Sequence, residues 1–119
     1  MSLNGSPKEK GCLYFYPKSH KAQKEYVDIF KNPHQPAHLN ELEKVYCELD
    51  AGDVTFHSGL TFHAAGSNQI DELREGMTII YIHDGNRFDA SDERNATHKS
   101  CDGLKDGEKI ETVYTPRLI

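Results

Sequence analysis

The sequence predicts an all-β fold of short strands, and three features of its 119 residues lead to this prediction. The segment Lys44–Leu49 alternates between apolar and polar side chains, which is typical of a strand with one buried face. The segment Met77–Ile82 is apolar on both faces, as expected of a central strand. Glycine-containing turns separate such segments at close intervals. Together they indicate a β-sandwich or barrel, although about five strands are too few to close a barrel of eight.

From the N-terminus, the polar residues 1–10 are expected to form a leader or loop, and residues 11–119 the domain. Cys12–Tyr16 is an aromatic-rich strand that ends at Pro17. One short helix of a turn or two is expected within Lys21–Phe30, before two prolines impose an extended loop.

After the alternating strand, two further strands are expected at Val54–His57 and Leu60–Ala64, with a turn at Ser58 and Gly59 between them. A polar loop then leads to the apolar strand. Beyond Gly85 the chain is charged and glycine-rich, so we expect peripheral loops there.

Composition excludes several classes of partner. The 14 basic and 19 acidic residues give a net charge of −5 without a long block of either sign, which argues against nucleic-acid binding. No apolar run approaches membrane-spanning length, so no membrane partner is expected. The three cysteines are scattered without a CxxC pair, which favours free thiols in a reducing, cytoplasmic compartment over a zinc ribbon.

The most informative stretch is GDVTFHSGLTFH, which ends at His63 and is followed by Arg74. A histidine on a strand can bind Fe(II), which non-haem oxygenases hold with two histidines and one carboxylate. Arginine binds carboxylates through its planar guanidinium and stays charged when buried. Plainer roles remain open, because His63 can be an ordinary hydrogen-bonded residue and Arg74 can pair with Asp71 or Glu72.

Together with GCLYFYPKSHK at Gly11–Lys21, this stretch resembles the C-terminal part of the phytanoyl-CoA dioxygenase family. The resemblance implies the C-terminal half of a double-stranded β-helix, a jelly-roll or cupin-like barrel, with Fe(II) and 2-oxoglutarate as cofactors and a small-molecule substrate. It places His63 as the distal iron ligand and Arg74 on the far carboxylate of 2-oxoglutarate. Lys18 stands where relatives usually have glycine, in Pro-Gly-Ser-His.

The family's other two iron ligands, a His-x-Asp or His-x-Glu pair, have no counterpart, because no histidine is followed two positions later by a carboxylate. Whether the chain alone is an enzyme is therefore left open, since its metal triad is incomplete. It is expected to be an incomplete domain or half of a site that a second chain completes. Exposed strand edges of such a half-barrel favour a homo-oligomer.

Two alternatives belong to other classes. One is a small cupin-like metal-binding or sugar-binding protein, because Gly59, His63 and Asn68 fit the second cupin motif with each spacing off by one residue. The other is a non-catalytic β-module that oligomerises through its edges. His57 lies near His63 across a tight turn, and a structural role is expected for it.

Overall fold

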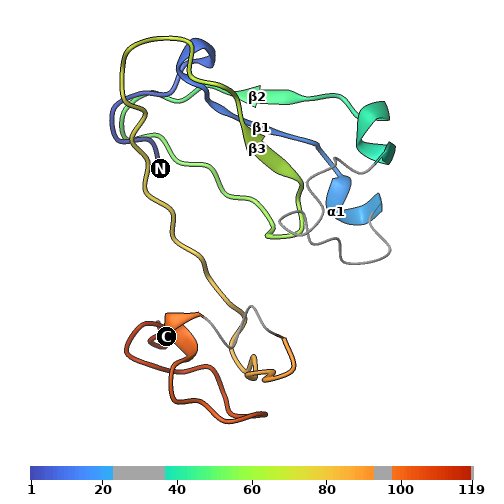
Figure 1. Cartoon of the computed structure of the whole chain (residues 1–119), viewed down its shortest axis with the longest axis vertical. Helices are drawn as coiled ribbons and strands as arrows, with labels where there is room; N and C mark the ends of the chain where they lie inside the picture. The colour runs from blue at the N-terminus through green and yellow to red at the C-terminus, as the bar shows by residue number, and fades with distance from the viewer. Residues whose placement is uncertain (23–36, 93–97, 119) are drawn as a thin grey trace. The chain divides into compact units, whose positions relative to one another are not determined.

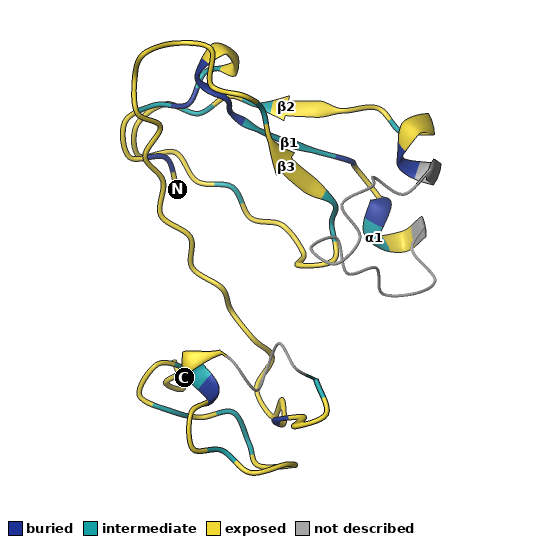
Figure 2. Ribbon diagram, viewed as in Figure 1, coloured by how far each residue is buried: buried dark blue, intermediate teal, exposed yellow. Residues whose placement is uncertain are grey.

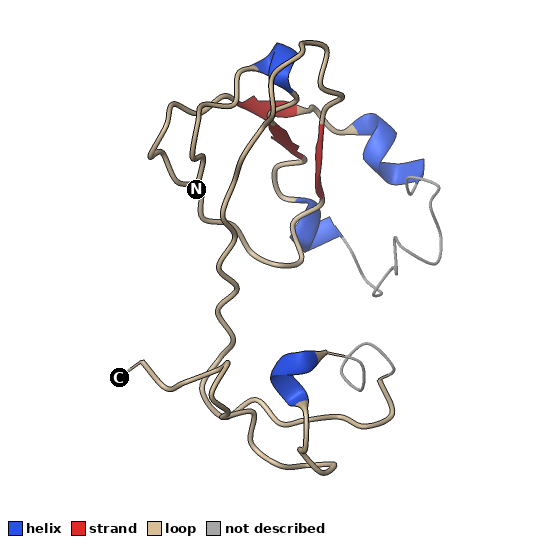
Figure 3. Ribbon diagram, turned by 60° about the vertical axis from the view of Figure 1, so that its left-hand side comes forward, coloured by secondary structure: helices blue, strands red, loops and turns tan. Residues whose placement is uncertain are grey.

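The computed structural model describes residues 1–22, 37–92 and 98–118. The chain divides into two compact units, Met1–Thr78 and Ile79–Ile119. Short strands and helical turns are joined by long loops (Figure 3). The expected sheet-like chain with few helices is thus confirmed, although the strands of the described residues do not close a barrel.

A three-stranded antiparallel sheet organises the first unit (Figure 1). Its central strand is β1, Leu13–Phe15, with β2, Val45–Cys47, on one side and β3, His63–Ala65, on the other. Burial decreases outward, because β1 is half-buried and β3 is exposed (Figure 2). The sheet therefore has two edges, one on β2 and one on β3.

One face of this sheet carries Leu13 and Phe15, because alternate residues of a strand point the same way. Directly paired residues share a face, and Phe15 pairs with both Val45 and His63. We call the surface formed by these residues, with Cys47 and Ala65, the Phe15 face.

The opposite face is aromatic and basic. Tyr14 pairs with Tyr46, and their ring centroids are 5.6 Å apart. The ammonium of Lys8 lies 4.2 Å from the centroid of the Tyr46 ring, and that of Lys44 lies 5.0 Å from the Tyr14 ring. These lysines cover the tyrosine rings through cation–π contacts.

Residues 1–10 contain the 3-10 helix η1, Lys8–Lys10, and two isolated bridges, Ser2 to Gly76 and Ser6 to Leu49. Lys10 is only 5% exposed, and its ammonium lies 3.1 Å from the Glu72 carboxylate. This segment is therefore attached to the loop that follows β3.

Two of the expected strands are not formed, and a third is displaced. Val54–His57 and Met77–Ile82 are described but have no ladder partner among the described residues. An apolar composition does not determine whether another strand pairs with a segment. Ile80 is 79% exposed, whereas a residue of a central strand would be buried. The strand expected at Leu60–Ala64 starts at His63 instead, because only from there does the chain pair with β1.

The short helix α1, Ser19–Ala22, overlaps the first two residues of the helix expected within Lys21–Phe30. The remainder of that expected helix, and the proline-rich loop after it, lie outside the described residues. A 3-10 helix, η2, Ala37–Glu41, precedes β2.

The turn before α1 holds Lys18 in the left-handed region, at φ 65°, which an L-residue occupies at a cost of about 1–2 kcal/mol. Lys18→Gly should therefore raise the free energy of unfolding by about 0.5–1 kcal/mol, after the added entropy of the unfolded glycine is counted. Chemical denaturation measures this change. Lys21→Gly, within α1, is the matched control and should instead destabilise by about 1 kcal/mol. Equal losses in both variants would contradict the strain at Lys18.

The second unit has little regular structure in its described part. Its 3-10 helix η3, Lys99–Cys101, buries Cys101, and an isolated bridge joins Arg87 to Lys109. Phe88 is buried beside this bridge. The unit also contains a pocket of about 600 Å³, lined partly by the apolar residues 79–82.

Candidate functional site

His63 is the first residue of β3 and projects from the Phe15 face. Its ring is stacked on Phe15 with centroids 5.7 Å apart and an interplanar angle of 28°. Its Nδ1 lies 2.8 Å from the carbonyl oxygen of Thr61, and a carbonyl can only accept, so Nδ1 carries the proton. In the neutral ring Nε2 then keeps its lone pair, which is the state that a metal ligand needs.

His57 lies beside His63, with ring centroids 4.6 Å apart. The same ring is 4.9 Å from Phe15, so the three rings form one cluster. Partial burial, together with repulsion from His63, lowers the pKa of His57 below its ordinary value of 6.5. The tight turn between the two histidines predicted that they lie close together. No feature of the sequence predicted their contact with Phe15.

Arg74 is held by the loop that precedes β1. Its Nη1 donates a hydrogen bond of 2.8 Å to the carbonyl oxygen of Gly11. Among the described residues Arg74 forms no ion pair, and Glu72 is paired with Lys10 instead. The plainer alternative, an ion pair with Asp71 or Glu72, is therefore not what this part of the chain contains.

Arg74 lies near one residue of the Phe15 face, Leu13. Arg74 lines a pocket of about 300 Å³ together with Leu13 and Thr55. Leu13 is two residues from Phe15 on β1, and Phe15 is the direct partner of His63. His63 thus pairs with one end of β1, whereas Arg74 lies near the other end, beside Leu13 and Gly11.

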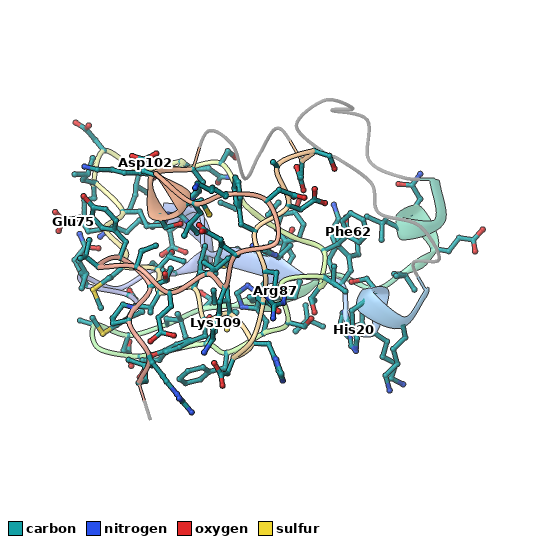
Figure 4. The ribbon with its side chains drawn as sticks, turned by 90° about the horizontal axis from the view of Figure 1, so that it is seen from below. His20, Phe62, Glu75, Arg87, Asp102 and Lys109 are labelled. Atoms are coloured by element: carbon teal, nitrogen blue, oxygen red, sulfur yellow. The ribbon has the colours of Figure 1, made fainter. Side chains whose placement is uncertain are left out.

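The turn of residues 17–20 is attached to the chain just before His63. Ser19 is completely buried, and its Oγ accepts a 2.9 Å hydrogen bond from the amide of Phe62. The amide of Tyr16 donates to the Phe62 carbonyl, at 3.0 Å. Figure 4 labels His20 and Phe62, which belong to the two segments that these bonds join. The segment leading into His63 is therefore fixed from both sides.

These residues fit an iron and 2-oxoglutarate site only in part. His63 has a ligand nitrogen available, and the guanidinium of Arg74 suits a carboxylate. However, no three His, Cys, Asp or Glu side chains within residues 1–22, 37–92 and 98–118 are grouped closely enough to hold one metal ion. The described residues therefore do not complete a two-histidine, one-carboxylate iron site.

No helix in the described part of the chain has the length and apolar character needed to cross a membrane. The family model described as phytanoyl-CoA dioxygenase matches residues 2–76, which include the sheet, both histidines of the cluster and Arg74. No curated protein and no solved structure matches the chain.

Proposed function

Because the chain belongs to the phytanoyl-CoA dioxygenase family, we propose that it supplies one half of an Fe(II)- and 2-oxoglutarate-dependent oxygenase site that hydroxylates a small molecule. In this role His63 is one iron ligand, and Arg74 binds the carboxylate of 2-oxoglutarate that lies away from the metal. The remaining ligands would come from outside the described residues. The observation that carries the proposal is that, within the matched segment, His63 belongs to the Phe15 face and Arg74 lines a pocket that Leu13 of the same face also lines.

When bound, Fe(II) would supply the oxygen-activating chemistry typical of the family. The chain's own contribution is positioning. The carbonyl of Thr61 fixes the tautomer and orientation of His63. The carbonyl of Gly11 accepts a hydrogen bond from one nitrogen of Arg74. In the contacts of the described residues, the other N–H groups of the guanidinium stay available to bind a carboxylate.

Anaerobic calorimetry with 2-oxoglutarate, with and without Fe(II), tests the proposal on the full chain. Binding is expected to require Fe(II) and to weaken by about 10–100-fold in Arg74→Ala, since a charge-assisted hydrogen bond contributes about 1.5–3 kcal/mol. Arg74→Lys should recover part of this loss, because it keeps the charge but not the planar fork. In His63→Ala, the addition of Fe(II) should no longer strengthen the binding of 2-oxoglutarate.

Arg87→Ala is the matched control, because Arg87 Nη1 also donates a 2.8 Å hydrogen bond to a glycine carbonyl, that of Gly107. It belongs to the second unit and should leave 2-oxoglutarate binding unchanged. Absence of Fe(II)-dependent binding in the unsubstituted chain would overturn the proposal, and so would equal affinities in Arg74→Ala and Arg87→Ala.

The sheet edges support a second element of the proposal, self-association of the chain. The amide of Tyr16 bonds to the Phe62 carbonyl and that of Gly66 to the Cys12 carbonyl, so alternation along β3 directs the amide of Ala65 away from β1. Such an outward amide can pair with another chain. Light scattering should show a dimer or larger species, and Ala65→Pro should shift it toward monomer. A monomer at high concentration of the unsubstituted chain would contradict this expectation.

A further inference from the structure

We infer that His57 and His63 together form a two-imidazole site for a divalent transition-metal ion, in which His57 is a ligand rather than a structural residue. The inference rests on the assignment of His63 as a metal ligand in the proposed function. It adds a second ligand that the family resemblance does not provide. The observation behind it is the ring cluster on the Phe15 face.

The separation of the two rings suits one metal ion. A metal–nitrogen distance of about 2.1 Å places each imidazole centre about 3.2 Å from the metal. Two imidazoles bound at right angles then have centres about 4.5 Å apart, and two bound at the tetrahedral angle about 5.2 Å apart. The observed separation is 4.6 Å, with the ring planes at 61°. The centroid separation therefore lies within the range that two imidazoles on one ion require.

The donor atoms are available as well. His63 uses Nδ1 for the Thr61 carbonyl and keeps Nε2 for a ligand. His57 forms no side-chain hydrogen bond to another described residue, and its ring is held by contacts with Phe15 and His63. Both side chains are exposed, so an ion can reach them without rearrangement of the sheet.

The chemistry of two neutral imidazoles selects the class of ion. Nitrogen ligands suit Ni²⁺, Cu²⁺, Zn²⁺ and Fe²⁺, whereas Mg²⁺ and Ca²⁺ prefer oxygen. Water would fill the other coordination positions, which leaves room for a bidentate ligand such as a 2-oxo acid.

The test is a titration of the full chain with Ni²⁺, followed by calorimetry and by NMR of the histidine rings. In the unsubstituted chain, paramagnetic Ni²⁺ should broaden the ring signals of His57 and His63 before those of the other histidines. The affinity for Ni²⁺ should fall by about tenfold or more in both His57→Ala and His63→Ala, which is at least the loss that follows removal of a supporting group from a metal site. His83→Ala, outside the first unit, is the control and should bind as the unsubstituted chain does.

The outcomes separate this inference from the proposed function. If His63→Ala weakens Ni²⁺ binding but His57→Ala does not, the two-imidazole site is wrong while the role of His63 stands. Broadening that begins at any other histidine would overturn the inference without requiring a variant. Arg74→Ala should weaken 2-oxoglutarate binding and leave Ni²⁺ binding unchanged. The role of Arg74 in binding the carboxylate is therefore tested independently of the two-imidazole site.

Discussion

Gly11→Ala is expected to destabilise the first unit by at least about 2–4 kcal/mol and to lower its unfolding midpoint by more than about 10 °C. Two causes combine at this position. Gly11 has a φ of 80°, which costs an L-residue about 1–2 kcal/mol. A Cβ there would also lie 2.6 Å from the carbonyl oxygen of Gly66 and 3.2 Å from the amide nitrogen of Asn68. Both are backbone atoms, so β1 and the end of β3 would have to separate.

Gly52→Ala separates the two causes in a thermal-unfolding measurement. Gly52 also has a positive φ, 95°, but a Cβ there would meet open space. Its variant should therefore show only the conformational cost, about 1–2 kcal/mol. Equal losses at the two glycines would contradict the close approach of Gly11 to Gly66. Because the Gly11 carbonyl also holds Arg74, the Gly11 variant should in addition bind 2-oxoglutarate more weakly.

Ser19→Ala is expected to cost about 1–3 kcal/mol and to loosen the segment that leads into His63. The substitution removes the buried hydroxyl that accepts from the amide of Phe62, and an alanine methyl cannot replace this acceptor. Denaturant unfolding measures the loss. Amide exchange reports the local effect, and the Phe62 amide should exchange faster in the variant.

Ser58→Ala is the matched control for this substitution. The hydroxyl of Ser58 likewise accepts from a backbone amide, that of Leu60, but at 3.3 Å and in an exposed position. Water can replace such an acceptor, so the free energy of unfolding should change by less than about 0.5 kcal/mol. If both serine variants lost the same stability, the buried bond would not be what fixes the turn of residues 17–20.

The sequence located the strands that have a distinctive side-chain pattern. The aromatic segment Cys12–Tyr16 contains β1, and the alternating segment Lys44–Leu49 contains β2. The pattern failed where strand identity depends on a partner. Met77–Ile82 has the composition of a central strand, but composition does not determine whether another strand lies alongside it. The positive φ of Lys18 was not predicted, although relatives usually have a glycine at this position.

For the site, the sequence identified the residue types and their order but not how they meet. His63 and Arg74 were selected for their chemistry, and the structure places His63 on the Phe15 face and Arg74 in a pocket that Leu13 of this face also lines. Their roles as metal ligand and carboxylate anchor stay predictions. A strand was expected from Leu60, but β3 begins at His63, so Thr61 lies before the sheet and contributes its carbonyl to His63. Backbone contacts of this kind carry no signal in the side-chain pattern.

The strand order also has a consequence for how the protein is made. The central strand β1 comes first in the chain, and both of its neighbours are encoded later, so the sheet cannot start as a local hairpin. During synthesis Leu13–Phe15 leaves the ribosome before either partner exists, with its aromatic side chains uncovered. Pairing of β1 waits until Val45–Cys47 has emerged, and the sheet is completed only after His63 has, so the long loops that must close make these steps slow. The nascent chain thus presents an exposed aromatic segment until β2 and β3 have emerged, which is the period when chaperone protection would matter most.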